Sequence, residues 1–154
     1  MKQILFLIFF ITASTSCRTT VKSIQTNSIL QGISGLVTEA KGNQMPMKGA
    51  DLQDNKGLQT TVYVYEATNI SQVTRSNKTG VYVSILTKRV ASITTDSLGA
   101  FTIALPVGKY SLFIKMGDAY FANAFDQYNN ICLIEVTEKK LTNARLVLNS
   151  NAFY

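Results

Sequence analysis

The sequence predicts an all-β protein, a single β-sandwich of about seven strands with Greek-key connections, preceded by a signal peptide. From residue 31 onward, short runs of alternating apolar and polar residues recur, and turn-forming residues separate them. No segment has a helical period of adequate length. The strands extend over about 120 residues, a length that can bury one hydrophobic core but is too short for two domains.

The first part of the chain has the pattern of a bacterial export signal. Lys2 supplies a positive charge, residues 4–11 form an uninterrupted apolar run, and small residues follow at positions 13–16. A membrane-spanning helix needs about 20 apolar residues, whereas the apolar part of a signal peptide needs about 7–15. We therefore expect residues 1–16 to be a signal peptide rather than a transmembrane anchor.

Cys17 follows this segment directly, and its position resembles the lipid-attachment site of a bacterial lipoprotein. The resemblance implies that the signal is removed and that Cys17 becomes the lipidated first residue of the mature protein. One acyl chain anchors a protein only weakly, whereas two or three hold it permanently. Ser14 departs from the lipoprotein pattern, which usually has Leu, Val or Ile three positions before the cysteine. The alternative is secretory cleavage near residues 13–16, which leaves a soluble protein with a free Cys17.

Residues 17–30 are polar and lack a strong period, so we expect a flexible tether between the lipid and the domain. A coil of about 13 residues spans about 20 Å, which would hold the domain, residues 31–154, close to the membrane. In Bacteroidetes-type lipoproteins, acidic residues soon after the cysteine are associated with surface export, and residues 18–22 contain none. We therefore expect a cell-envelope protein on the periplasm-facing side of the outer membrane.

Charge and composition exclude several classes of function. The net charge of +6 falls to +5 once Lys2 is removed with the signal, and the basic residues are scattered, so we expect no nucleic-acid partner. The chain has no histidine, which rules out a Ser-His-Asp triad and histidine metal sites. The nine acidic residues are dispersed, and only Asp118 and Asp126 flank an aromatic segment as a hydrolase pair would. We expect no enzyme, no cofactor and no metal.

Cys132 lies in an apolar run, residues 131–134, and has no disulfide partner once Cys17 is acylated. A reactive cysteine needs a neighbouring base or an electropositive setting. We therefore expect Cys132 to be a small buried hydrophobe within a strand.

Several segments have the composition of strands. In residues 60–67 the valines share one face of the expected strand and the tyrosines share the other. Residues 41–58 are rich in Gly, Asn, Asp and Pro, and residues 69–80 are polar, so both are expected to be loops. Strands are expected at residues 33–38, 60–67, 81–86, 88–95, 101–105, 110–115, 131–136 and 144–148.

The clearest alternation lies in residues 101–115. Apolar side chains alternate in residues 101–105 and again in 110–115, and a short segment with Pro106 and Gly108 joins the two runs. Two such runs predict a hairpin with one buried face. That face would consist of Phe101, Ile103, Leu105, Tyr110, Leu112 and Ile114, with Ser111, Phe113 and Lys115 on the other face of the second strand.

The same segment carries a family resemblance. Residues 95–101 read Thr-Asp-Ser-Leu-Gly-Ala-Phe, and residues 106–110 read Pro-Val-Gly-Lys-Tyr. The pattern Thr-Asp-x-x-Gly-x-Phe, an alternating strand and Pro-x-Gly-x-Tyr resembles the carboxypeptidase regulatory-like domain, a transthyretin-like (prealbumin-like) β-sandwich. The resemblance implies a fold and not an activity, because the zinc chemistry of carboxypeptidase relatives lies in a different domain.

The resemblance extends from residue 32 to the C-terminus. Residues 32–38 fit the opening strand of the family, and residues 42–46 and 121–126 are similar to a lipoprotein subgroup of Bacteroidetes-type bacteria. The long loop before Thr60 and the insertion at residues 69–80 depart from the minimal pattern.

Each position of the central motif has a structural reason. Asp96 can accept backbone N–H bonds from residues two or three positions further on, and Gly99 can take the positive φ of a tight turn. Phe101 then enters the core, while Pro106 presets φ for the next reversal and Gly108 completes it. We therefore interpret Asp96 as a structural residue rather than a metal ligand or a catalytic one.

Residues 117–130 form the best candidate for a binding surface, because they mix aromatic rings with Asn, Asp and Gln. A glycan- or peptide-binding module would use Tyr120, Phe121, Phe125 and Tyr128. The alternative is that the phenylalanines pack the edge of the sandwich. The first expectation is a non-enzymatic, lipid-anchored scaffold or interaction module, with the membrane as one partner and envelope proteins or glycans as others.

Overall fold

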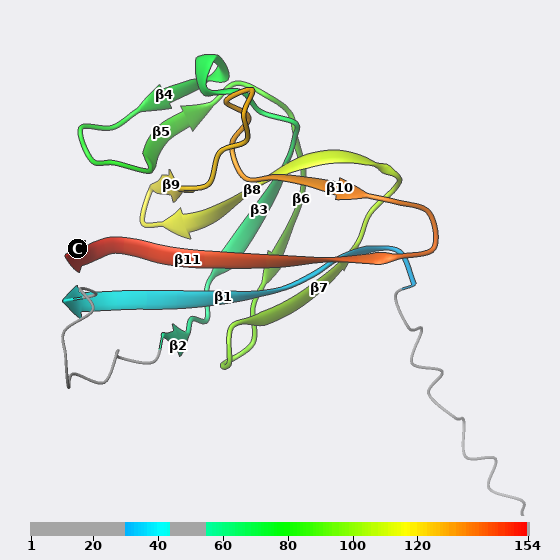
Figure 1. The fold of residues 1–154 in the computed structure, drawn as a ribbon, viewed down its shortest axis with the longest axis horizontal. Coiled ribbons are helices and arrows are strands. Elements are labelled where there is room, and N and C mark those ends of the chain that lie inside the picture. The colour runs from blue at the N-terminus through cyan, green and yellow to red at the C-terminus, as the bar shows by residue number, and fades with distance from the viewer. Residues whose placement is uncertain (1–29, 44–54, 154) are drawn as a thin grey trace, which may run out of the picture.

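The computed structural model describes residues 30–43 and 55–153, which fold into a β-sandwich (Figure 1). The only helix among these residues is one 3-10 turn, η1 (Ile70–Gln72). The strands are β1 (Gly32–Asn43), β2 (Lys56–Gly57), β3 (Thr61–Glu66), β4 (Val73–Arg75), β5 (Val81–Ile85), β6 (Arg89–Thr94), β7 (Ala100–Ala104), β8 (Gly108–Met116), β9 (Ala119–Phe121), β10 (Leu133–Val136) and β11 (Leu141–Phe153).

Two sheets make up the sandwich, which confirms the predicted all-β fold. The four-stranded sheet has the order β11-β1-β2, and β7 also pairs with β1. In this sheet β1 is parallel to β11 and antiparallel to β7. The seven-stranded sheet has the order β4-β5-β9-β8-β3-β6, and β10 pairs with the first part of β8.

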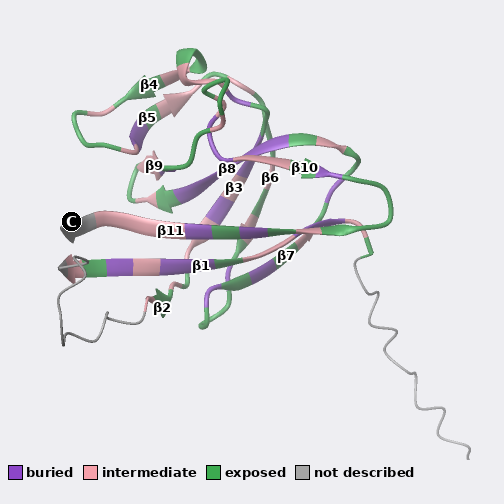
Figure 2. Ribbon diagram, in the orientation of Figure 1, coloured by how far each residue is buried: buried purple, intermediate pink, exposed green. Residues whose placement is uncertain are grey.

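The core lies between the sheets and follows the alternation of the strands. On the seven-stranded sheet Val62 and Val64 pair with Ile114 and Leu112, and all four side chains are buried. Figure 2 shows buried segments on the facing strands β1, β7 and β11. Buried residues of these three strands include Ile33, Val37, Phe101, Ala144 and Leu146.

Every predicted strand is present, but the described residues form eleven strands rather than about seven. The additional strands are short: β2 and β4 lie in segments that were expected to be loops, and β9 follows a tight turn at Gly117. Two or three residues are too few for a period of two to be recognised. Residues 1–29, with the expected signal peptide, Cys17 and most of the tether, lie outside the described residues, as do residues 44–54.

The predicted hairpin of residues 101–115 is wrong. β7 pairs with β1 and β8 pairs with β3, so the segment between them carries the chain from one sheet to the other. Pro106 accepts a hydrogen bond from Tyr110 Oη through its carbonyl oxygen at 3.1 Å. Gly108 is the first residue of β8 and does not complete the turn. Alternation of apolar and polar residues shows which face of a strand is buried. Strands of both sheets in a sandwich bury one face, so alternation does not show with which strand each of them pairs.

The other face of β8 is also buried, which the single-face prediction did not allow. Ser111 and Phe113 are both fully buried. Ser111 Oγ accepts a hydrogen bond from Thr68 N at 2.9 Å. The ring of Phe113 packs edge-on against Tyr65 and Tyr82, with centroids 5.5 and 5.8 Å away. The hydrophobic core therefore continues onto the face of β8 that points away from the other sheet.

The Asp96 turn is structural, as the sequence predicts. Asp96 Oδ1 accepts hydrogen bonds from the backbone N–H groups of Leu98 and Ala100 at 2.9 and 2.8 Å. Gly99 has φ +83°, and a Cβ added there would lie 2.0 Å from the carbonyl oxygen of Val37. Gly99 O in turn accepts a hydrogen bond from Val37 N at 2.8 Å. The turn thus docks directly on β1, and no side chain fits at this position.

Gly99→Ala should destabilise the protein by more than the ~1–3 kcal/mol of backbone strain alone, because its Cβ must displace β1. The matched control is Gly117→Ala, where φ is +60° but no atom lies within 4 Å of the added Cβ. Urea unfolding of the two purified variants measures the difference. Equal losses at the two positions would show that the turn does not touch β1.

Candidate functional site

The four aromatic residues that the sequence singles out do not form one surface. Phe121 is 1% exposed and packs in the core. Tyr120 is half-buried, and its ring lies among other tyrosines on the outer face of the seven-stranded sheet. Only Phe125, at 47%, and Tyr128, at 69%, are exposed. The binding hypothesis therefore stays open for Phe125 and Tyr128 alone.

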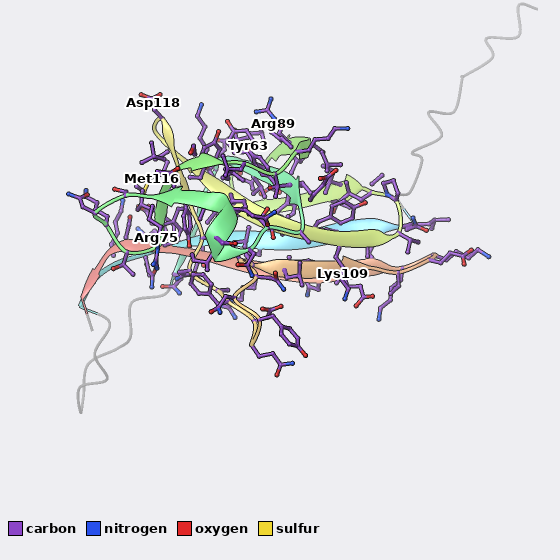
Figure 3. The ribbon with its side chains drawn as sticks, turned by 90° about the horizontal axis from the view of Figure 1, so that it is seen from above. Tyr63, Arg75, Arg89, Lys109, Met116 and Asp118 are labelled. Atoms are coloured by element: carbon purple, nitrogen blue, oxygen red, sulfur yellow. The ribbon has the colours of Figure 1, made fainter. Side chains whose placement is uncertain are left out.

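The tyrosine cluster explains the position of Tyr120. Its ring packs edge-on against Tyr63 and Tyr65, with centroids 5.5 and 6.0 Å apart. Burial is the main cause that raises the pKa of Tyr65 far above its ordinary value, and a hydrogen bond with Tyr120 raises this pKa further. The Arg89 guanidinium covers the ring of Tyr63 at 5.4 Å, and Figure 3 labels both residues side by side. These rings already use one another as partners, so the cluster is structural.

Asp126 organises the loop that carries Tyr128. Asp126 Oδ1 accepts hydrogen bonds from the backbone N–H groups of Tyr128 and Asn130, both at 2.8 Å. Asp126 Oδ2 accepts a third bond from Asn130 Nδ2 at 2.8 Å. Asn129 takes a positive φ of 62°, which closes the turn. These hydrogen bonds hold the pKa of the Asp126 carboxyl below its ordinary value.

The loop is also tied to its neighbours. Asn69 Nδ2 donates to Tyr128 O at 2.8 Å, and Ile70 N donates to Asn129 O at 3.0 Å. At the base of the loop, Ile131 N donates to the carbonyl oxygen of the buried Thr68 at 2.8 Å. The gold connection between β9 and β10 accordingly lies beside η1 in Figure 1. Tyr128 is therefore presented by a braced loop.

A groove opens beside this loop, between β10 and the middle of β11. Its volume is about 210 Å³. The side chain of Arg145, which is exposed, makes no ion pair or hydrogen bond with any described residue. We call this hollow the Arg145 groove; it is lined by Ala124, Phe125, Asp126, Cys132, Leu133, Ile134 and Arg145.

The sequence did not predict Arg145, Leu133 or Ile134 as site residues. A signal was available for Arg145, because a single charge stands between the buried Ala144 and Leu146 in an otherwise uncharged strand. Charges in such a position are typical of edge strands. β11 pairs with β1 on one side, and no described strand pairs with its other side.

Cys132 is one of the residues that line the Arg145 groove. It is 8% exposed, which confirms the predicted buried hydrophobe, and burial raises the pKa of its thiol to about 11. The prediction that it lies within a strand is wrong: β10 begins at Leu133, and Cys132 has φ +41°. Its N–H donates to Ala124 O at 2.8 Å, and its carbonyl oxygen accepts from Leu112 N at 3.2 Å. These bonds hold it in a conformation that a residue with a side chain rarely adopts.

The carboxylates do not assemble into a catalytic pair. Asp126 lines the groove and is committed to the loop, whereas Asp118 is exposed in the β8–β9 turn and does not line it. In the part of the chain that the structure describes, no three His, Cys, Asp or Glu residues lie close enough to hold a metal ion. The described residues also include no helix with the length and apolar character that crossing a bilayer requires.

Comparison with known proteins gives no relative. No family model, no curated protein and no solved structure matches this chain.

Asp126→Asn should destabilise the protein at neutral pH, because the new amide would place a donor against the donating Asn130 amide. Since the folded pKa of Asp126 is lowered, its stabilisation is complete above the unfolded pKa and disappears as pH falls through the lower folded value. The difference in Tm between wild type and variant should therefore shrink as pH is lowered below 3.8, the ordinary value.

The exposed Asp118 supplies the control, since Asp118→Asn removes the same charge from a turn outside the groove. Its Tm should follow that of the wild type across the same pH range. A Tm difference for Asp126→Asn that stays constant into strong acid would contradict the proposed role of the carboxylate.

Proposed function

We propose that this chain is a non-enzymatic, lipid-anchored interaction module of the bacterial cell envelope. Support for the anchor comes from the export pattern of residues 1–16 and from Cys17 directly after it. Support for a carboxypeptidase regulatory-like, transthyretin-like domain comes from the motif at residues 95–110 together with the β-sandwich. The tether composition favours the periplasm-facing side of the outer membrane.

The module binds an extended peptide segment of a partner protein in the Arg145 groove. The observation that carries this proposal is the groove itself, where the unpaired Arg145 stands beside the exposed ring of Phe125. A cation without a partner next to apolar side chains fits a peptide with a carboxylate beside an apolar residue. The unpaired side of β11 also offers backbone groups to which an extended chain can add as a strand.

A peptide fits this groove better than a glycan. Sugar sites need several polar side chains that are free to bond hydroxyl groups. In the loop, the Asp126 carboxylate already accepts three hydrogen bonds, and one of them comes from the Asn130 amide. Most other groove residues are apolar: Ala124, Phe125, Leu133 and Ile134.

The anchor can be tested by counting reactive thiols, because the chain has two cysteines. Cys132 is buried and its pKa is about 11, so Ellman's reagent should not detect it in the native protein. If Cys17 is acylated, the purified full-length product has no reactive thiol when native and one when unfolded in guanidinium. One thiol when native and two when unfolded would overturn the anchor, and the mass of the N-terminal peptide provides an independent check.

The groove can be tested with a phage-displayed library of random linear peptides, selected against the purified full-length protein. We expect the recovered peptides to share an Asp or Glu next to an apolar residue. Arg145→Glu should weaken their binding about tenfold or more, because a charge-assisted hydrogen bond is lost and a repulsion is gained.

Arg75→Glu is the matched control, since Arg75 is an exposed arginine of β4 that does not line the groove. It changes the net charge equally and should leave the affinity unchanged. Equal losses of affinity in both variants would show that net charge causes the effect and would overturn the proposal that the peptide binds in the groove. If no peptides are enriched and the protein binds neutral glycans on an array, the proposal of a peptide ligand is wrong and the ligand is a sugar.

A further inference from the structure

Three segments meet at the end of the sandwich where β1 begins. Gln31 Nε2 donates to Leu105 O at 3.0 Å, and Gln31 Oε1 accepts from Lys139 N at 3.1 Å. Gly32 N donates to Lys140 O at 3.1 Å. The start of the domain is thus joined to the β7–β8 connection and to the β10–β11 turn. These hydrogen bonds hold the three segments together at this end of the sandwich.

This end exposes apolar side chains among lysines. Leu30 is 71% exposed, Val107 is 60% exposed and Leu141 is 37% exposed, one on each of the three segments. Lys139 and Lys140 are also exposed there, and Lys139 Nζ lies 3.6 Å from Glu138 Oε1 in an exposed ion pair. We call the set Leu30, Val107, Lys139, Lys140 and Leu141 the basal end.

We propose that the basal end rests on an anionic lipid surface. Lysines bind anionic headgroups while their methylene stems lie along apolar surface, and exposed aliphatic side chains enter the boundary between headgroups and acyl chains. Val107 and Leu30 provide such side chains, and the β10–β11 turn adds two lysines and one glutamate, Glu138, which pairs with Lys139. The mixture of isolated apolar side chains and lysines fits a bilayer surface better than it fits the continuous apolar core of a protein interface.

The position of the basal end supports a membrane in particular, an argument that rests on the proposed anchor. Twelve residues lie between Cys17 and Leu30, which limits the separation of these two residues to about 45 Å when the chain is fully extended and to about 20 Å on average for a flexible coil. The basal end is therefore the first part of the domain that the anchor brings to the bilayer. The braced loop with Tyr128 lies near η1, far from the start of β1 (Figure 1), so it would stay accessible.

The absence of tryptophan from the chain allows a direct test. Val107→Trp places the only indole of the protein at the basal end, and Leu86→Trp, at a residue that is 74% exposed in the β5–β6 loop, is the control. Each full-length variant is mixed with vesicles of phosphatidylethanolamine and phosphatidylglycerol that contain brominated lipid. We expect a blue shift and strong quenching for residue 107 and neither for residue 86.

Flotation of the same vesicles separates this proposal from the proposed anchor. Protein that floats with the vesicles while the indole at 107 stays unquenched would keep the anchor and overturn the basal contact. Protein that does not float, with an unquenched indole, would overturn both. Equal quenching at both positions would show that the domain has no preferred side.

Reversing the charge of the lysines tests their contribution to the proposed membrane contact. Each lysine near an anionic surface contributes about a fivefold factor in binding. Lys139→Glu combined with Lys140→Glu should therefore reduce the quenching of the Val107→Trp indole strongly in phosphatidylglycerol vesicles. Lys88→Glu, in the β5–β6 loop, should leave it unchanged. Unaltered quenching in the double variant would overturn the role of the lysines.

Discussion

The burial of both faces of β8 is the constraint on which the rest of this structure depends. Leu112 and Ile114 enter the sandwich, while Ser111 and Phe113 point the other way and are equally buried. A strand in this position must have a cover on each side, because exposed Phe113 would lose its burial free energy. The four-stranded sheet covers one face, and the tyrosine cluster with the chain around Thr68 covers the other. The outer face of this sheet is therefore no free platform for a ligand.

The cover of the outer face also determines where the candidate site can lie. Thr68 has no exposed surface. Its backbone N–H donates a hydrogen bond to Ser111 Oγ, and its hydroxyl oxygen lies 2.6 Å from that of Thr87. Its carbonyl oxygen accepts a hydrogen bond from the backbone N–H of Ile131. One buried residue thus joins β8, the β5–β6 loop and the loop that follows β9. A loop fixed at its base and closed by Asp126 loses little conformational entropy when a partner binds its exposed rings. Rigidity, more than the number of aromatic residues, makes this segment the better candidate.

Features that involve residues close together in the sequence could be predicted from it, whereas contacts between residues far apart in the sequence could not. The alternation in residues 60–67 and 110–115 predicts which side chains enter the core, because a period of two ties each residue to one face. The motif at residues 95–101 predicts the Asp96 turn because its hydrogen bonds lie within five residues. The neighbour of β7 and the second cover of β8 depend on chain segments far away in sequence. The groove escapes prediction for the same reason: Arg145 meets Phe125 only after β11 has paired with β1.

Arg145 has two roles that a single charge can fulfil together. An unpaired edge as long as β11 invites pairing with any extended chain, and a charge in its middle opposes this. Further along, Asn123 Nδ2 donates to Asn149 Oδ1 at 2.7 Å, so the segment after β9 covers that part of the edge. What remains open is the stretch beside the groove, where burying the guanidinium without a partner would be costly. A chain that supplies a carboxylate removes this cost, whereas a neutral or basic chain does not. The feature that protects the edge would therefore also select the ligand that we propose for it.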